Sequence, residues 1–105
     1  MFVHAVYFSL RDDLTPAERD RFAAGLRSVR GIEGVRHAYI GVPASTDRPV
    51  IDRSYSNTLV LVFRDKAAHD AYQVHPEHDR FREECGGFWT RVRIFDSVTE
   101  DNASA

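Results

Sequence analysis

The segment 2–10 has apolar side chains at nearly every position, among its even-numbered residues as well as its odd-numbered ones. The first set contains Phe2, Val6, Phe8 and Leu10 with His4 as its polar member, and the second contains Val3, Ala5, Tyr7 and Ser9. Because successive side chains of a strand point to opposite faces, this pattern predicts a strand that is largely buried on both faces. Such a strand has to lie inside a sheet that is covered on two sides, which limits the folds open to a chain of 105 residues.

A helix is predicted from Pro16 onward. Thr15 can cap its first turn, proline suits the first helical position, and Glu18 can complete the capping pair from the third position. The helix should lay one apolar face on the sheet, formed by residues at helical spacing: Phe22, Leu26 and Val29.

Three further strands are predicted over 35–42, 55–64 and 88–98, from runs rich in β-branched and aromatic residues. Between the last two strands, Asp65 can cap a second helix. That helix should end directly before Pro76, because proline disfavours helical geometry in the residue that precedes it. Pro76 itself suits the first position of a short third helix.

The order strand, helix, strand, strand, helix, strand predicts an α+β ferredoxin-like fold with a four-stranded antiparallel sheet. We assign residues 1–98 to this single domain and 99–105 to a flexible C-terminal tail. The helices can cover only one face of the sheet, so the other face should pack on a second copy of the chain and form an α+β barrel homodimer. The expected interface residues are Val3, Ala5, Tyr7, Thr58, Val60 and Val62.

The charges are mixed along the chain and sum to −2, so no basic surface is expected that would bind nucleic acid. No apolar run approaches the ~20 residues of a membrane-spanning helix, and the first residues lack the features of a signal peptide. Cys85 is the single cysteine, which excludes an intrachain disulfide and suits a reducing compartment. A cytoplasmic protein without membrane or nucleic-acid partners is therefore expected.

Four polar side chains are expected in the apolar layer between the sheet and the helices: His4, Asn57, Tyr72 and His78. Buried polar groups are costly unless they bond to one another, to water or to a ligand. One interpretation is a network that only satisfies buried polarity, and the other is a small-molecule pocket with convergent polar groups. In the second case, aromatic walls would come from Phe8, Phe63 and Phe81.

His78 is the candidate general base and Tyr72 its catalytic partner. In the first turn of a helix, the positive end of the helix dipole disfavours the imidazolium ion, although Glu77 and Asp79 act in the opposite direction. A neutral ring could accept a proton next to a substrate carbonyl. Tyr72 could donate a hydrogen bond to the oxygen on which negative charge develops.

No metal ion or other cofactor is expected. His75 and His78 are three residues apart, but the intervening proline should keep them off a common helical face. A metal site built from these two histidines and His4 is therefore the weaker interpretation. His37 and His69 are expected to be exposed to solvent and without a functional role.

Four stretches of the sequence together resemble the stress-responsive A/B barrel (Dabb) family. They are Val3-His4-Ala5-Val6, Leu59–Phe63 with the following Arg64-Asp65, Tyr72-Gln73-Val74-His75-Pro76-Glu77-His78, and Val92-Arg93-Ile94-Phe95-Asp96. The most specific of them is the Tyr-x-x-His-Pro-x-His pattern, which follows a strand and a helical turn. The resemblance extends as far as Val98 and implies a dimeric α+β barrel.

The resemblance also implies a range of roles. Many members of the family are linked only to stress, some are stable structural oligomers, and a plant branch typified by olivetolic acid cyclase performs an intramolecular aldol condensation of a linear polyketide. In that branch a histidine matching His78 is the base, a tyrosine matching Tyr72 assists it, and a histidine matching His4 lines the cavity. Asn57 stands where the plant cyclase has histidine, so the present chain departs from that branch there.

Three functional hypotheses follow. The leading one is a homodimer whose pockets bind a small carbonyl or aromatic compound, with cyclase or isomerase chemistry at His78 if the protein is an enzyme. The second is a non-catalytic stress-related or structural dimer, in which the cluster of His4, Tyr72 and His78 only satisfies buried polarity. The third is a cofactor-free or haem-dependent monooxygenase of the same barrel architecture.

Overall fold

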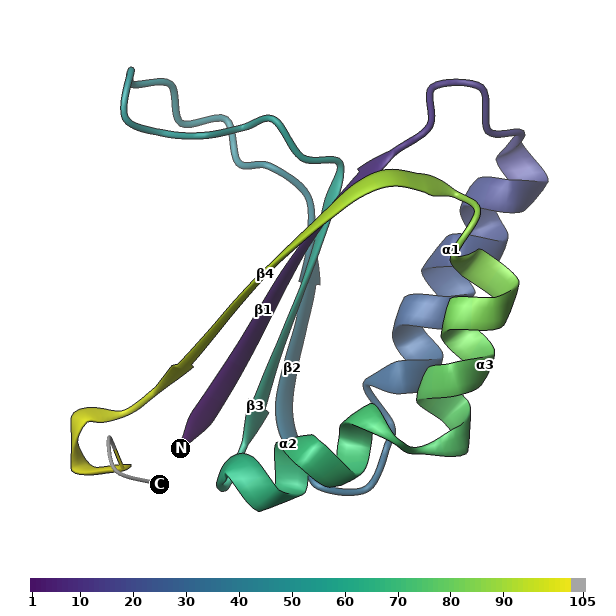
Figure 1. Cartoon of the computed structure of the whole chain (residues 1–105). Helices are drawn as coiled ribbons and strands as arrows, with labels where there is room; N and C mark the ends of the chain where they lie inside the picture. The colour runs from purple at the N-terminus through teal and green to yellow at the C-terminus, as the bar shows by residue number, and fades with distance from the viewer. Residues whose placement is uncertain (103–105) are drawn as a thin grey trace.

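The computed structural model describes residues 1–102 and contains the expected order of elements (Figure 1). The strands are β1 (Phe2–Leu10), β2 (Val35–Gly41), β3 (Asn57–Phe63) and β4 (Trp89–Val98). The helices are α1 (Pro16–Val29), α2 (Lys66–Gln73) and α3 (Pro76–Cys85), followed after β4 by a 3-10 turn at Glu100–Asn102. Of the tail expected over 99–105, residues 103–105 lie outside the described part. Within that part, no helix combines the length and the apolar composition needed to cross a bilayer.

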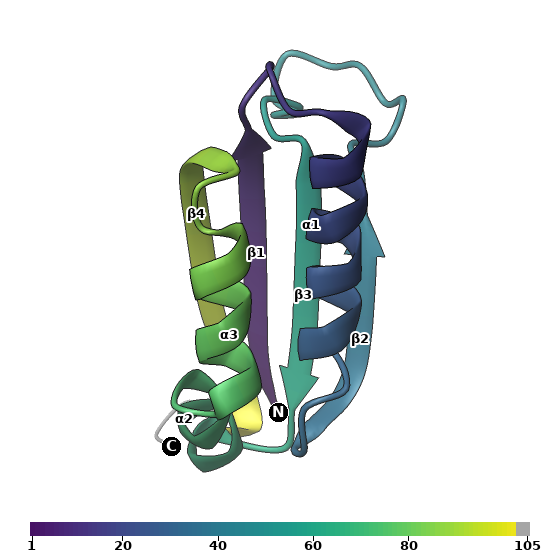
Figure 2. The same cartoon turned by 90° about the vertical axis from the view of Figure 1, so that its right-hand side faces the viewer.

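The four strands form one sheet in the order β2-β3-β1-β4, and every neighbouring pair is antiparallel. The central strand β1 pairs with both β3 and β4, so that His4 lies opposite Leu61 on one side and Asp96 on the other. Helices α1 and α3 cover one face of the sheet, and α2 lies at its lower end (Figures 1 and 2). This arrangement confirms the predicted ferredoxin-like α+β fold.

Helices α1 and α3 approach each other closely at Gly25. A Cβ atom at this position would lie 2.7 Å from Cδ1 of Phe81 and 3.0 Å from Sγ of Cys85, which is closer than van der Waals contact. A glycine inside a helix costs about 1 kcal/mol relative to alanine. Here the missing side chain lets α3 pack directly on α1, and α3 carries His78. Cys85 is a buried free thiol at this contact, and burial raises its pKa.

Thr15 caps α1 as the sequence predicts. Its hydroxyl oxygen accepts a hydrogen bond from the backbone N–H of Glu18 at 3.1 Å, and the Glu18 carboxylate accepts one from the backbone N–H of Thr15 at 2.9 Å. Thr15→Ala should therefore lower the free energy of unfolding by about 1 kcal/mol, measured by urea denaturation. Thr46→Ala, in an exposed part of a loop, is the matched control. Equal effects of the two substitutions would contradict the role of the cap.

The sheet face opposite the helices carries the six residues expected at a dimer interface. Each of them is partly buried: Val3, Ala5, Tyr7, Thr58, Val60 and Val62. Phe95 of β4 lies beside Tyr7 on this face, with the ring centroids 6.0 Å apart, and is 59% exposed. Among residues 1–102, no helix lies over this apolar sheet face (Figure 1).

The long β2–β3 loop, residues 42–56, extends from the sheet on the side opposite the helices (Figure 1). Near its end, the Asp52 carboxylate accepts a hydrogen bond from the Arg93 guanidinium at 3.2 Å, and Tyr55 meets Tyr7 edge to face at 4.9 Å between ring centroids. Hydrogen bonds from Ser54, together with Arg93, lower the pKa of Asp52 to about 2. The loop is thus attached to the open sheet face and does not lie over the layer that contains His4 and His78.

Candidate functional site

The turn between α2 and α3 places Tyr72 and His78 next to each other. His75 is the N-cap of α3, and its Nδ1 accepts a hydrogen bond from the backbone N–H of Glu77 at 3.0 Å. Pro76 then occupies the first helical position, as the sequence predicts. The rings of Tyr72 and His78 meet edge to face across this turn, with their centroids 4.8 Å apart.

A cavity of about 320 Å³ lies between this turn and the sheet. Its polar lining residues are His4, Tyr72, Gln73, His78 and Arg82. Its apolar and aromatic walls include Val6, Phe8, Leu59, Phe81 and Trp89. This combination of apolar walls and a few convergent polar groups is typical of sites for small organic molecules.

His78 presents a neutral imidazole in this cavity. The side chain is half-buried, and its Nδ1 atom is enclosed with no hydrogen-bond partner among residues 1–102. Burial lowers the pKa of the ring, and the positive charge of Arg82 lowers it further, against the opposing effect of Asp79. An unpaired buried nitrogen costs about 1–3 kcal/mol.

Tyr72 presents a protonated phenol beside it. The residue is only 2% exposed, and burial raises the pKa of its hydroxyl well above the ordinary value of 10.0. The ring contacts His4 edge to face at 5.8 Å and Phe63 at 5.2 Å between centroids, which restricts its orientation. Its hydroxyl can therefore act as a hydrogen-bond donor with a defined direction.

Asp96 holds His4, the third polar residue of the cavity. Nδ1 of His4 and Oδ1 of Asp96 are 2.6 Å apart, and the two residues are cross-strand partners. Burial lowers the pKa of His4, and Asp96 only partly opposes this, so the neutral ring donates its Nδ1 proton and keeps Nε2 as an acceptor. Sequence reasoning did not find Asp96. The alternation of β4 was the available signal, because it places Asp96 on the same face as Val92 and Ile94.

His69 is buried, which contradicts the expectation that it is exposed. It is 8% exposed, its ring stacks on Phe2 at 4.2 Å between centroids, and its Nε2 lies 4.0 Å from Oδ2 of Asp96. The sequence did not predict this burial because α2 has only eight residues, too few for helical periodicity to identify its buried face. His37, in contrast, is exposed as expected.

Within residues 1–102, the side chains of His4, His69 and Asp96 are the group whose donor atoms could hold a metal ion, because these atoms all lie within 4.8 Å of one another. Two imidazoles and a carboxylate suit first-row transition metals better than calcium or magnesium. The hydrogen bond between His4 and Asp96 would compete with a metal for the same two atoms. The metal site considered from the sequence was a different one, built from His4, His75 and His78. In the structure, Nδ1 of His75 caps α3 instead.

The structure brings only some of the expected site residues together. Phe8 and Phe81 line the cavity with His4, Tyr72 and His78, but Asn57 and Phe63 do not. Asn57 pairs with Phe8, four residues along the strand from the partner of His4, a separation of about 13 Å at the rise of a strand. Phe63 is fully buried behind Tyr72. Arg82 and Trp89 also line the cavity and were not expected there.

The sequence matches the model of one known domain family. The profile of the Stress Responsive A/B Barrel Domain family, Dabb, matches residues 2–99. No curated protein sequence matches the chain significantly. The family match therefore covers almost the whole chain.

Solved structures confirm the fold. A Dabb family protein with a ferredoxin-like fold from Mesorhizobium loti superposes with a TM-score of 0.76 at 27% identity, covering 93% of this chain and 95% of that one. A dimeric ferredoxin-like protein of unknown function from Thermobifida fusca gives 0.75 at 17% identity, covering 93% and 90%. A hydroxynitrile lyase from Passiflora edulis gives 0.76 at 14% identity, covering 94% of each chain.

Proposed function

Since the chain belongs to the stress-responsive A/B barrel family, we propose that its pocket binds a small aromatic carbonyl compound and that His78 removes a proton next to the carbonyl group. The observation that carries this proposal is the neutral imidazole of His78, which lines a cavity of about 320 Å³ beside the protonated phenol of Tyr72. A neutral base and a hydrogen-bond donor facing one small space are the two groups that enolisation requires.

The chemistry needs only these two side chains. The neutral imidazole of His78 accepts the proton, and the electron pair of the broken C–H bond forms the C=C bond of an enolate. The carbonyl oxygen, on which the negative charge develops, accepts a hydrogen bond from the Tyr72 hydroxyl. Return of the proton to another carbon gives an isomer, and attack of the enolate carbon on a second carbonyl gives a ring.

The apolar walls support an aromatic or otherwise flat ligand. Phe8, Phe81 and Trp89 surround the cavity and pack on one another, with centroids 5.1 Å apart for Phe8 and Trp89 and 5.7 Å apart for Phe81 and Trp89. The hydroxynitrile lyase from Passiflora edulis supports the idea that this fold can carry a catalytic site. At 14% identity, the two proteins share a fold alone.

We also propose that the protein is a homodimer that packs sheet against sheet. Support comes from the apolar open face of β1 and β3 and from the structural relatives that are described as dimeric. Packing two such faces together would cover them and form the α+β barrel expected from the family. The cavity is lined by residues of α2 and α3 and by the buried residues of β1, so it lies on the helix side of the sheet, away from this interface.

Exchange of carbon-bound protons tests the proposed chemistry without knowledge of the natural substrate. Phenylacetone in D₂O with the protein should lose its benzylic proton signals in NMR spectra, because each proton taken by His78 is replaced by a deuteron. His78→Gln should reduce the catalysed rate by about 100-fold or more, and Tyr72→Phe by about tenfold or more. His37→Gln, an identical change at an exposed histidine, should leave the rate unchanged.

The pH dependence of this exchange is a further readout of the same experiment. Only the neutral ring accepts a proton, so the rate should rise with pH through an inflection below 6.5, the ordinary pKa of histidine, and then become constant. The groups that act on this titration are Arg82 and Asp79 on α3, His4 on β1 and His69 on α2. If the wild type and His78→Gln catalyse exchange equally or not at all, the cluster is non-catalytic, as the second hypothesis states.

A further inference from the structure

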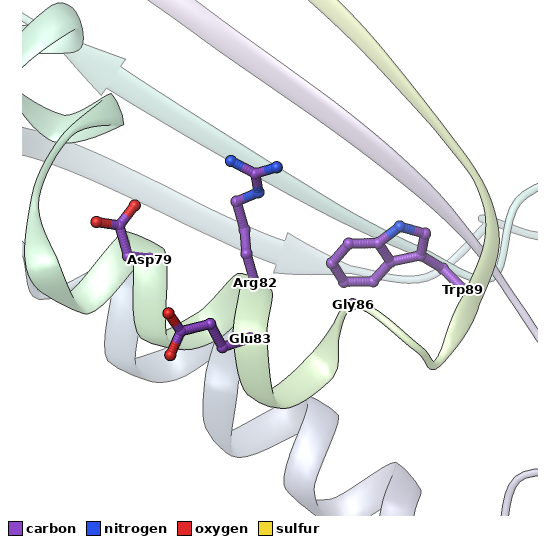
Figure 3. A pocket seen from close by; sticks show the side chains of 5 residues that line it. All are labelled: Asp79, Arg82, Glu83, Gly86 and Trp89. Atoms are coloured by element: carbon purple, nitrogen blue, oxygen red, sulfur yellow. The ribbon is translucent and has the colours of Figure 1, made fainter.

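Arg82 lies where two neighbouring cavities meet. It lines the cavity of about 320 Å³ that contains Tyr72 and His78, and also a cavity of about 450 Å³ on the outer side of α3. Trp89 is likewise shared by both cavities. In Figure 3 the Arg82 side chain extends away from α3, between Asp79 and the indole of Trp89. Arg82 thus lies between the candidate site and the neighbouring cavity.

Arg82 has no salt-bridge partner among residues 1–102, where none of the ion pairs within 4.0 Å includes it. Arg80, on the same helix, is different: it lies 3.4 Å from a carboxylate oxygen of Glu77 and 3.2 Å from one of Glu84. Glu83 is close to Arg82 in sequence, but Figure 3 shows its carboxylate directed elsewhere. The Arg82 guanidinium is therefore available to an external anion.

The charge of Arg82 acts on the candidate base. The two residues are four positions apart on α3, so they lie on one face of the helix. The positive charge of Arg82 contributes to the lowered pKa of His78. An anionic group bound to Arg82 would therefore place the adjoining part of its molecule next to His78 and Tyr72.

We propose that Arg82 binds the carboxylate of the ligand, so that the pocket selects aromatic 2-oxo acids over neutral ketones of the same shape. This inference rests on the proposed function, because it names the substrate class of the same pocket. The guanidinium fork can hold both carboxylate oxygens at once, which fixes the orientation of the ligand as well as its position. The keto group beside the carboxylate then faces Tyr72, and the aromatic ring packs against Phe81 and Trp89.

Two probes of nearly equal shape isolate the contribution of the carboxylate. Phenylpyruvate has a carboxylate where phenylacetone has a methyl group, and both have a benzylic carbon next to a ketone. Isothermal titration calorimetry should show that the wild type binds phenylpyruvate about tenfold or more tightly than phenylacetone. Arg82→Gln should reduce the affinity for phenylpyruvate to that for phenylacetone, and Arg82→Lys should give an intermediate value because it keeps the charge without the fork.

Arg80→Gln is the matched control, since it removes the same charge from the same helix at a residue that is already paired. It should leave the preference for phenylpyruvate unchanged. Far-UV circular dichroism and thermal unfolding of each variant would show that the fold is retained. A wild type that binds the two probes equally, or binds neither, would overturn the proposal, as would an equal loss of preference in Arg80→Gln and Arg82→Gln.

The proposed chemistry and this inference can fail independently. His78→Gln should reduce the catalysed exchange by about 100-fold or more yet keep the preference for phenylpyruvate, because binding of the carboxylate does not need the base. A wild type that prefers phenylpyruvate but catalyses no exchange would contradict the proposed function and retain the role of Arg82. A wild type that catalyses exchange of phenylacetone but binds both probes equally would contradict the role of Arg82 and retain the proposed function.

Discussion

Phe63→Ala is expected to lower the free energy of unfolding by about 3–5 kcal/mol. Phe63 is fully buried at the end of β3. Its ring contacts Tyr72, His69 and Phe2, at 5.2, 5.6 and 6.5 Å between centroids, so it supports the wall on which the candidate site is built. Truncation to alanine removes these contacts and leaves a cavity that the surrounding strands and α2 can only partly fill.

Urea denaturation at one fixed protein concentration would measure this effect, since the stability of a dimer depends on concentration. Phe63→Leu retains most of the buried volume and should cost about 1 kcal/mol. A loss below about 1 kcal/mol for Phe63→Ala would contradict its place in the core. Loss of binding by Phe63→Leu at unchanged stability would instead favour a direct contact with ligand, the role expected for Phe63 from the sequence.

Val60→Asp is expected to convert the proposed dimer into a folded monomer. Val60 lies at the centre of the open sheet face, opposite Ala5 on β1 and Tyr39 on β2. Two-fold symmetry would bring two such carboxylates into one apolar interface, and an unpaired buried charge costs several kcal/mol. The dissociation constant of the dimer should therefore rise by at least about 100-fold.

Sedimentation velocity over a range of protein concentrations would measure the change in mass. Ala24→Asp adds the same charge on the exposed side of α1 and should leave the dimer intact. Circular dichroism would show that Val60→Asp keeps its helices and strands, because the residue is only partly buried in a single chain. A folded Val60→Asp variant that remains dimeric, or a wild type that is monomeric, would contradict packing through this face.

The local signals in the sequence were reliable where a few neighbouring residues decide the backbone. Thr15 and Asp65 cap the helices they were expected to cap, and Pro76 opens α3 directly after the break. The alternation in 2–10 correctly predicted a strand, and β1 lies inside the sheet between β3 and β4. One of its two alternating sets is buried under the helices, and the other is only partly buried in a single chain. These signals were enough to predict the order of elements and, with it, the ferredoxin-like fold.

The candidate site was predicted less completely. The Tyr72 to His78 turn and its proximity to His4 follow from helical spacing and strand alternation, and the structure brings these residues to one cavity. Asn57 was misplaced because alternation shows which face a residue is on, but not how far along the strand it lies from a given partner. His69 was missed because a helix of eight residues does not show its buried face in its sequence.

The sequence by itself determined the elements, their order and the turn that joins Tyr72 to His78, because capping, proline geometry and side-chain alternation act over a few residues. Only the tertiary structure decided that Asp96 meets His4, that His69 is buried beside them, and that Arg80 is paired while Arg82 has no ion-pair partner among residues 1–102. These facts depend on strand register and on how α3 packs against α1 and the sheet. Both are set by the packing of the whole core, to which every residue contributes and which no short segment encodes.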